Sequence, residues 1–255
     1  MHTSLETSRF LVLLLPDGWN SKIDMVNEFA EMESHPYPTK RNMQEALRWL
    51  VKDNQDGDSL VFYFSGHGLN QPNPSEYDGF NETICPIDYM TAGMIIDDEI
   101  NDTIVRPLKK GVKLHAIIDS CHSGTVLDLP YAYSTKEYSR PLIVKYRWLN
   151  MNPPYGVYKG TSGGLAISIC ACQDNQFALA TSALSESGKQ MESVMTYTFR
   201  KALLENSRVT YANLLASMHN DIWVTSQHGI FRRERPQEPL LSSSEVFDLN
   251  EQFVL

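Results

Sequence analysis

Two short apolar segments of this chain share one design: each ends at a polar, chemically reactive side chain. Residues 114–118, LHAII, lead within three positions to Cys121. Residues 59–64, SLVFYF, lead into the sequence SGHG, in which His67 is the reactive group. Runs of about four to eight apolar or β-branched residues bounded by turn residues are typical of buried strands. We therefore predict two buried strands, each presenting a functional group at its carboxyl end.

Helical periodicity appears between and after these strands. Thr39 is the predicted N-cap of an amphipathic helix. The apolar positions of this helix, spaced three and four residues apart, are Met43, Ala46, Leu47, Leu50 and Val51. Asp97 or Asp98 is the predicted N-cap of a second helix that runs to about Lys109, before Gly111. Two more helices are predicted at residues 192–206 and 210–223.

The order of these elements predicts an α/β fold. A strand, a helix and a second strand form a crossover long enough for parallel pairing, and residues 163–172 are a third predicted core strand. We expect a single domain over residues 1–255 with a largely parallel central sheet between layers of helices. Parallel strands end at the same edge of a sheet, so His67 and Cys121 are expected to lie together.

The remaining segments are less regular. The apolar run Phe10–Leu15 is too short for a membrane span or a signal-peptide core, and we interpret it as a strand or a buried segment. Residues 69–93 are predicted to form a long polar loop, a feature that tends to be functional. Residues 129–160 are an irregular connector in this interpretation, and residues 245–249 are a final strand.

Charge and cysteine content narrow the functional classes. A net charge of −9 without a basic stripe disfavours a nucleic-acid surface. Without a predicted membrane span or export signal, we expect a monomeric protein of the cytoplasm, with the nucleus as a second compartment. In such a compartment cysteines are reduced, and their spacing relative to the histidines matches no zinc pattern. The cysteines are Cys85, Cys121, Cys170 and Cys172.

A thiol and an imidazole at neighbouring strand ends suit nucleophilic catalysis. A nearby histidine lowers the pKa of a thiol and can protonate a leaving amine, so Cys121 is the candidate nucleophile and His67 the general acid. The backbone N–H groups of Gly68 and Cys121 are candidate oxyanion donors. Asp119 precedes Cys121 by two residues, and Ser65 has the same relation to His67, so both point to the same side of their strands. An acid at this position suits a cationic substrate side chain.

A structural interpretation of the same residues stays open at this point. A single cysteine after an apolar strand is more often a buried structural thiol than a nucleophile. The sequence SGHG alone is often a turn. Two strand ends of matching design reduce the weight of this alternative. A serine hydrolase is disfavoured, because no Gly-x-Ser-x-Gly elbow appears after a predicted strand.

The motifs around both groups resemble the paired signatures of type I metacaspases, which are caspase-related cysteine peptidases. Residues 63–68 are YFSGHG and residues 119–130 are DSCHSGTVLDLP. The spacing of His67 and Cys121 is similar to the His-to-Cys spacing of about 50 residues in caspases. The resemblance extends from about residue 36 to the C-terminus. Supporting motifs are PTKRN at 38–42, GDSLVF at 57–62, IDDEIN at 96–101, KGTSGG at 159–164 and QEPLLSSSE at 237–245.

The resemblance implies a caspase-like fold with a large part at residues 36–128, a connector at 129–160 and a small part at 161–255. It implies an endopeptidase of protein substrates that cuts after Arg or Lys, in programmed cell death or stress proteolysis. The catalytic dyad falls on His67 and Cys121, and the acidic pocket falls on Asp119 with Ser65.

The resemblance also implies activation by calcium, a cation that prefers hard oxygen ligands. The family's calcium ligands fall on Asp97, Asp98 and Asp128, with Asn81 at a fourth position that is usually aspartate. An amide in place of a carboxylate weakens the expected site. The alternative role of Asp97 and Asp98 is helix capping.

The first 35 residues depart from the family pattern, and we expect an atypical or truncated N-terminus. The family's Gly-Cys-x-x-Asp-Ala helix start is absent, and its aspartate normally completes the acidic pocket. We therefore expect a core strand and half of the pocket's charge to be missing, with residues 10–15 as the candidate substitute strand. This departure motivates a second hypothesis, in which the protein is catalytically impaired and binds or regulates active metacaspases.

The connector carries basic residues at which an active enzyme of this specificity would cut its own chain. They are Lys136, Arg140, Lys145, Arg147 and Lys159.

Overall fold

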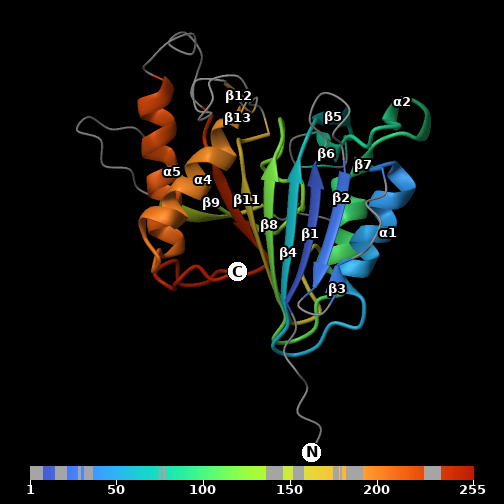
Figure 1. The fold of residues 1–255 in the computed structure, drawn as a ribbon, viewed down its shortest axis with the longest axis horizontal. Coiled ribbons are helices and arrows are strands. Elements are labelled where there is room, and N and C mark those ends of the chain that lie inside the picture. The colour runs from blue at the N-terminus through green and yellow to red at the C-terminus, as the bar shows by residue number, and fades with distance from the viewer. Residues whose placement is uncertain are drawn as a thin grey trace, which may run out of the picture.

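The fold is seen in a computed structural model (Figure 1). It describes residues 8–14, 22–27, 30–31, 37–74, 76, 79–135, 146–151, 158–174, 178, 180–181, 192–226 and 237–255. The elements in chain order are β1 Ser8–Leu14, β2 Lys22–Asn27, β3 Ala30–Glu31, α1 Lys40–Val51, β4 Ser59–Ser65, β5 Gly68–Pro72, β6 Phe80–Ile84, α2 Tyr89–Ala92, β7 Ile95–Ile96, α3 Asp97–Ile100, the π-helical η1 Asn101–Val105, β8 Lys113–Asp119, β9 Tyr131–Thr135, β10 Tyr146–Asn150, β11 Leu165–Cys170, β12 Ala180–Thr181, β13 Glu192–Ser193, α4 Val194–Glu205, α5 Tyr211–Ser226 and β14 Leu240–Ser243.

The centre of the molecule is a mixed sheet with a parallel core. In the described part of the chain it has nine strands in the order β10-β9-β14-β11-β8-β4-β1-β2-β3. Strands β1, β4, β8 and β11 pair parallel, and the strands outside them pair antiparallel. Helix α1 lies on one side of the sheet, and α4 and α5 lie on the other (Figure 1). The predicted three-layer α/β fold of caspase-like type is therefore confirmed.

Strand alternation divides the core into two hydrophobic clusters, one on each face of the sheet. In β8, Leu114, Ala116 and Ile118 pack in the cluster that contains the buried face of α1. Ile117 lies in the other cluster, which contains the buried residues of α4 and α5. Successive side chains of a strand point to opposite faces, so a strand buried on both faces is apolar almost throughout. This explains the continuous apolar runs of the central strands.

Helix α1 forms as its sequence predicts. The Thr39 Oγ1 accepts a hydrogen bond from the backbone N–H of Asn42 at 3.3 Å and caps the helix. Its buried residues are Met43, Ala46, Leu47, Leu50 and Val51. The cap and the apolar face of this helix are confirmed.

The apolar run near the N-terminus forms a strand of the central sheet, β1. Strand β1 pairs parallel with β4 from Ser8 opposite Ser59 to Leu14 opposite Ser65. The expected loss of a core strand is therefore wrong, whereas the interpretation of residues 10–15 as a strand is right to within two residues at each end. The apolar run is itself a strand signal, and this signal does not depend on the motif that follows it. Residues 15–21, where the family's acidic helix start would follow, lie outside the described residues.

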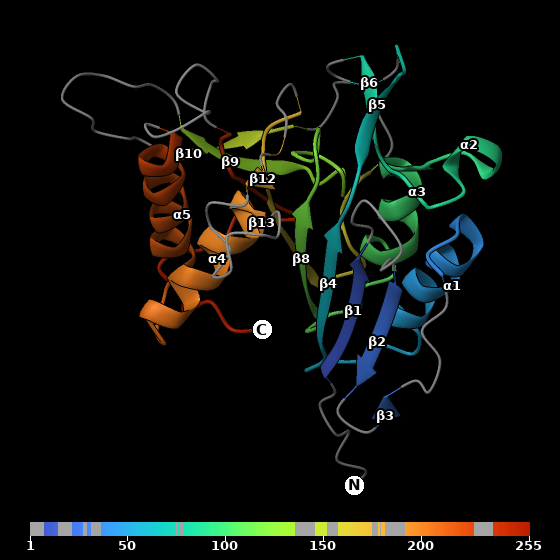
Figure 2. The same ribbon diagram turned by 45° about the horizontal axis from the view of Figure 1, so that its top comes forward.

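The polar segment after His67 is more ordered than predicted. Residues 69–93 contain β5, β6 and α2, and β5, β6 and β7 form a small antiparallel sheet. Figure 2 shows this small sheet beyond the carboxyl ends of β4 and β8. The connector also contributes two strands, β9 and β10, which extend the main sheet. Its residues 136–145 lie outside the described residues.

Two further predictions are wrong. The final strand is at Leu240–Ser243, paired antiparallel with β11, whereas residues 245–249 form no strand. Ile96 is the N-cap of α3, and Asp97 and Asp98 lie in its first turn. The helical segment ends at Val105 instead of Lys109, because Pro107 has no backbone N–H with which to continue the helical hydrogen bonds.

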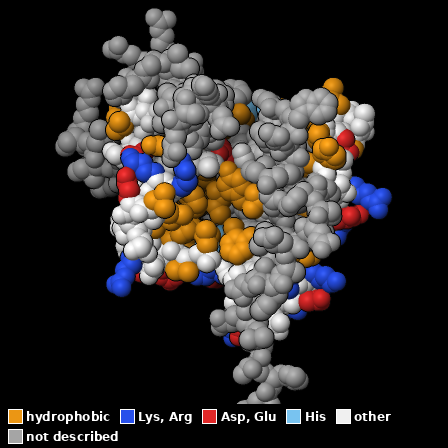
Figure 3. All heavy atoms as spheres, viewed as in Figure 1, with side chains coloured by type: hydrophobic (Ala, Val, Ile, Leu, Met, Phe, Trp, Pro, Cys, Tyr) orange, Lys and Arg blue, Asp and Glu red, His pale blue; other side chains and the backbone are white. Residues whose placement is uncertain are grey.

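Hydrophobic side chains gather on one face of the molecule, beside α4 and over the neighbouring strands of the sheet (Figure 3). Phe10 of β1 and Tyr63 of β4 are partly buried against the cluster on this face. Among the described residues, no helix combines the length and apolar composition needed to cross a membrane.

We predict that the buried His115 makes the fold sensitive to acid. Burial lowers the pKa of His115 to about 3, and its Nε2 lies 2.6 Å from the hydroxyl of Tyr211. The unfolded chain binds a proton below about pH 6.5 while the folded chain does not, so stability falls as pH decreases from 6.5 towards 3. Between pH 7 and pH 5 this amounts to about 2 kcal/mol.

Urea unfolding of the wild type and His115→Gln, measured at both pH values, tests this. The variant should lose about 2 kcal/mol less between pH 7 and pH 5 than the wild type. Equal losses in the two proteins would contradict the prediction.

Candidate active site

The strands β4 and β8 bring the predicted dyad to one edge of the sheet. Their parallel register places Ser65 opposite Asp119, the last residue of each strand. The Gly66 N–H donates to the carbonyl of Asp119 at 3.2 Å, which joins the two chains just beyond the strands. His67 is exposed and Cys121 is half-buried. His67 lies two residues beyond Ser65, and Cys121 lies two residues beyond Asp119. Both therefore lie at the same edge of the sheet, as predicted.

Gly68 allows close contact between the two strand ends. A Cβ at this position would lie 2.2 Å from the carbonyl oxygen of Cys121, a separation that no real side chain adopts. The backbone before it is fixed because the Cys85 N–H donates to the carbonyl of His67 at 3.0 Å. Glycine is therefore required here for the histidine and cysteine segments to approach.

Asp174 holds the turn that follows Cys121. The His122 Nδ1 donates to the carbonyl of Asp174 at 2.5 Å, and His122 itself adopts a φ of 53°. The Asp174 Oδ1 accepts from the N–H of Thr125 at 2.8 Å. This residue was missed in the sequence. It follows the core strand β11 as Cys121 follows β8, so the same strand-end argument could have found it.

The cysteines differ in burial. Cys121 is the one cysteine that is not buried, and its Sγ accepts a hydrogen bond from the Ala178 N–H at 3.3 Å. Burial raises the pKa of Cys85 and of Cys172 to about 11 and raises the pKa of Cys170 further. Buried thiols with raised pKa values are poor nucleophiles. All four cysteines are free.

The predicted pocket acid, Asp119, is buried against the start of α4. Its side chain accepts hydrogen bonds from Ser193 Oγ, at 2.7 Å on Oδ1, and from Thr196 Oγ1 on Oδ2. Ser193 is also the N-cap of α4. Burial raises the pKa of Asp119, and the two hydroxyls oppose this shift. Ser193 and Thr196 could not be associated with Asp119 from the sequence, because they lie at the start of a helix, 74 and 77 residues away.

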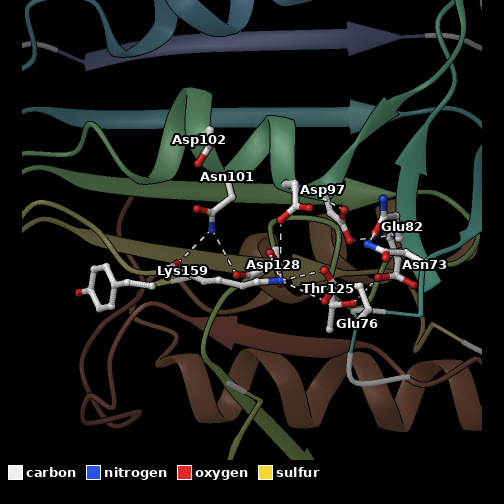
Figure 4. A network of polar contacts seen from close by, with 12 residues as sticks. Asn73, Glu76, Glu82, Asp97, Asn101, Asp102, Thr125, Asp128 and Lys159 are labelled. Carbon is white, nitrogen blue, oxygen red and sulfur yellow. Dashed lines mark hydrogen bonds and ion pairs between the residues drawn. The ribbon is translucent and has the colours of Figure 1, made fainter. Parts of the chain in front are cut away.

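Of the predicted calcium ligands, Asp98 and Asp128 form ion pairs with the ammonium of Lys159. Figure 4 shows Asp128 beside Lys159. The Lys159 Nζ lies 2.5 Å from Asp128 Oδ2, 3.0 Å from Glu76 Oε2 and 3.9 Å from Asp98 Oδ1. Burial raises the pKa of Asp128 to about 7, against the attraction of Lys159. Neither Lys159 nor Glu76 was predicted as part of this cluster.

Asp97 and Asn81 lie beside this cluster with other partners. The Asp97 carboxylate accepts from the N–H groups of Glu82 at 3.0 Å and Asp98 at 2.8 Å. Burial raises the pKa of Asp97 to about 6. The Asn81 Oδ1 accepts from Asn73 Nδ2 at 2.7 Å.

The side chains of Asn81, Asp97, Asp98 and Asp128 are chemically suited to a hard cation such as calcium, because each of them offers oxygen ligands. The cation among the carboxylates is an ammonium, however. In the described part of the chain, no group of three or more His, Cys, Asp or Glu side chains is arranged to hold a metal ion.

The described sheet, with a half-buried thiol and an exposed imidazole at the ends of adjacent parallel strands, defines the class of α/β proteins with a caspase-like fold. The family profile described as "Metacaspase, peptidase C14 domain" matches residues 11–130. The chain is 48% identical to Metacaspase-1 of Arabidopsis thaliana over 221 residues, 85% of this chain and 58% of the relative. This chain belongs to the metacaspase family.

Other relatives agree. Metacaspase-3 of Arabidopsis thaliana is 43% identical over 92% of this chain and 66% of its own length. Metacaspase-1 of Saccharomyces cerevisiae is 34% identical over 86% of this chain and 56% of its own length. The chain thus spans about half to two thirds of the length of these relatives. A solved protein from Geobacter sulfurreducens is similar in fold alone, with a TM-score of 0.52 and 20% identity over 83% of this chain and 75% of that one.

We predict that Gly68→Ala disturbs the contact between the two strand ends. The added Cβ would meet the Cys121 carbonyl at 2.2 Å, so the backbone must shift, at a cost of about 1–3 kcal/mol in the free energy of unfolding. The shift should also change the rate at which a thiol reagent modifies Cys121, measured by mass spectrometry.

Gly79→Ala is the matched control. Gly79 has a φ of 88° but no atom within 4 Å of an added Cβ, so this variant bears backbone strain alone, about 1 kcal/mol. Its Cys121 should react at the wild-type rate. Identical Cys121 reactivity in both variants and the wild type would show that Gly68 does not position the thiol.

We predict that Ser193 stabilises the fold through the carboxylate of Asp119. Ser193→Ala removes a donor from a buried carboxylate, which should lower the free energy of unfolding by about 1–3 kcal/mol in a urea titration. Loss of the N-cap also contributes, and Asp119→Asn separates the two effects. In the Asp119→Asn background, Ser193→Ala should cost at least about 0.5 kcal/mol less.

The exposed Ser207 provides the control, because Ser207→Ala should change stability by no more than about 0.5 kcal/mol. An equal cost of Ser193→Ala in both backgrounds would leave helix capping as its whole role.

Proposed function

We propose that this chain is a cysteine endopeptidase of the type I metacaspase kind, which cleaves protein substrates after Arg or Lys. The observation that carries the proposal is the in-register pairing of β4 and β8, which places His67 and Cys121 beyond adjacent strand ends. Family membership supports the same chemistry. A role in programmed cell death or stress proteolysis follows from the family resemblance.

In the proposed reaction, the Cys121 thiolate attacks the scissile carbonyl carbon. The backbone N–H groups of Gly68 and Cys121 are the proposed donors to the oxyanion that forms. His67 takes the thiol proton and gives it to the leaving amine, which departs as the thioester forms. Water, deprotonated by His67, then hydrolyses the thioester and releases the free thiol.

Asp119 is the proposed partner of the substrate's basic side chain, with Ser65 beside it in the register. The carboxylate is buried and already accepts from two hydroxyls, so it is held in one orientation. A carboxylate has about four lone-pair positions. The Thr196 N–H occupies a third, so one remains for a guanidinium or ammonium group.

Calcium is the proposed activator. Asp97, Asp98 and Asp128 would hold it, with the carbonyl oxygen of Asn81 as a fourth ligand. When bound, the ion would neutralise the carboxylates next to the Cys121 segment. The link to that segment is short, because Thr125 Oγ1 donates to Glu82 Oε2 at 2.7 Å and Glu82 N–H donates to Asp97.

We predict that hydrolysis of a fluorogenic peptide depends on Cys121 and His67 and on a basic residue before the cleaved bond. Purified protein should cleave a peptide with P1 Arg or Lys in the presence of calcium, and activity should fall at least about a thousandfold in Cys121→Ala or His67→Ala. A P1 Asp peptide should not be cleaved, because its carboxylate would face Asp119.

Cys85→Ala is the matched control, since Cys85 is buried and its pKa is raised; this variant should keep wild-type activity. Absence of Cys121-dependent turnover with and without calcium would overturn the proposal and favour a non-catalytic regulator of active relatives.

We further predict that the active enzyme cuts its own connector at one or more of the basic residues between 136 and 147. Intact mass spectrometry after calcium addition should show two fragments from the wild type and one intact chain from Cys121→Ala. A wild-type chain that stays whole while it cleaves the peptide would contradict this.

A further inference from the structure

Lys159 is buried within a carboxylate cluster formed by Glu76, Asp98 and Asp128, rather than lying on the surface beside it. It is 7% exposed, and its ammonium lies within 4 Å of carboxylate oxygens of Glu76, Asp98 and Asp128. The side chains of Glu76 and Asp128 are also largely buried, at 15% and 14% exposure. Ion pairs with so little access to water are screened weakly. The lysine therefore serves as the cation of this cluster.

The backbone at Lys159 is anchored independently of the ammonium (Figure 4). Asn101 Nδ2 donates to the carbonyl oxygens of Leu127, Asp128 and Lys159, at 2.9, 3.2 and 3.1 Å. Arg106 Nη2 donates to the carbonyl of Tyr158 at 3.1 Å. The side chain can consequently leave the carboxylates by rotation about its own bonds while its backbone stays beside Asp128.

Counted over the described residues, the cluster has fewer positive than negative charges. One ammonium faces three carboxylates, and the buried Asp97 lies next to Asp98. A divalent cation supplies twice the charge and accepts six to eight oxygen ligands, whereas an ammonium offers three hydrogens. A hard divalent cation and the ammonium would thus compete for the same oxygens.

We propose that Lys159 is a tethered competitor of calcium, which holds the carboxylate cluster together without metal and must be displaced when calcium binds. This inference rests on the calcium regulation proposed above. It identifies Lys159 as the residue that sets the calcium concentration at which the site fills. Because Asp128 and Cys121 belong to one short segment after β8, the exchange would occur next to the nucleophile's loop.

Calorimetric titration with calcium tests the proposal in a Cys121→Ala background, which prevents self-cleavage. Lys159→Met keeps the length and removes the charge, and it should bind calcium at least tenfold more tightly than the parent. Lys159→Arg, which keeps the cation, should bind within threefold of the parent. Lys110→Met, at an exposed lysine outside the cluster, should match the parent.

A second measurement needs no substitution at Lys159. Amine acetylation of the parent, followed by mass spectrometry, should modify Lys159 slowly without calcium and at least fivefold faster with it, while Lys110 reacts equally in both states. Calcium affinity unchanged or weakened in Lys159→Met, or Lys159 reactivity unaffected by calcium, would overturn the proposal.

The outcomes separate this inference from the proposed function. If neither the parent nor Lys159→Met binds calcium, the competitor role fails, while Cys121-dependent peptidase activity is judged on its own assay. If Lys159→Met binds more tightly but no peptide is cleaved, the cation exchange holds and the peptidase proposal fails.

Discussion

The candidate site depends on one constraint, the parallel register of β4 and β8. With Ser65 opposite Asp119, any residue two positions further along either strand must lie at the same sheet edge. A shift of one residue would point Asp119 to the opposite face and separate His67 from Cys121. The register is held by apolar side chains that are buried on both faces, such as Phe62 and Ile117. The position of the reactive groups is thus fixed by the hydrophobic core rather than by contacts of their own.

The parts of the fold that could be predicted are those with a local physical signal. Helix α1 has a cap at Thr39 and an apolar face, and both strands of the site are uninterrupted apolar runs. Parallel pairing then follows from the length of the crossover. The site residues His67 and Cys121 could be located because they terminate such strands, although their catalytic roles stay a proposal.

The errors occurred where the sequence carries no local signal of the fold. Strands β5 and β6 are largely polar and belong to a separate small sheet, so no hydrophobic alternation marks them. The segment 245–249 contains apolar residues because Phe247 packs against Trp148 and Tyr211, a side-chain role that requires no strand. Ser193 and Lys159 were missed because only the folded chain places them beside Asp119 and Asp128, from which they are distant in sequence.

Asp119 and Asp128 lie at opposite ends of the segment that contains Cys121, and their carboxylates are stabilised by different partners. Asp119 is held by neutral hydroxyls, which leave a carboxylate able to attract a cation from outside. Asp128 is held by an internal ammonium, so an external cation must first replace one that is already present. Burial raises the pKa of both carboxyl groups, and each therefore gains from a positive partner. A cationic substrate side chain at Asp119 and a divalent ion at Asp128 would each supply the positive charge that a buried carboxylate lacks. Both carboxylates belong to the segment that contains Cys121, so the proposed specificity and the proposed regulation both act next to the nucleophile.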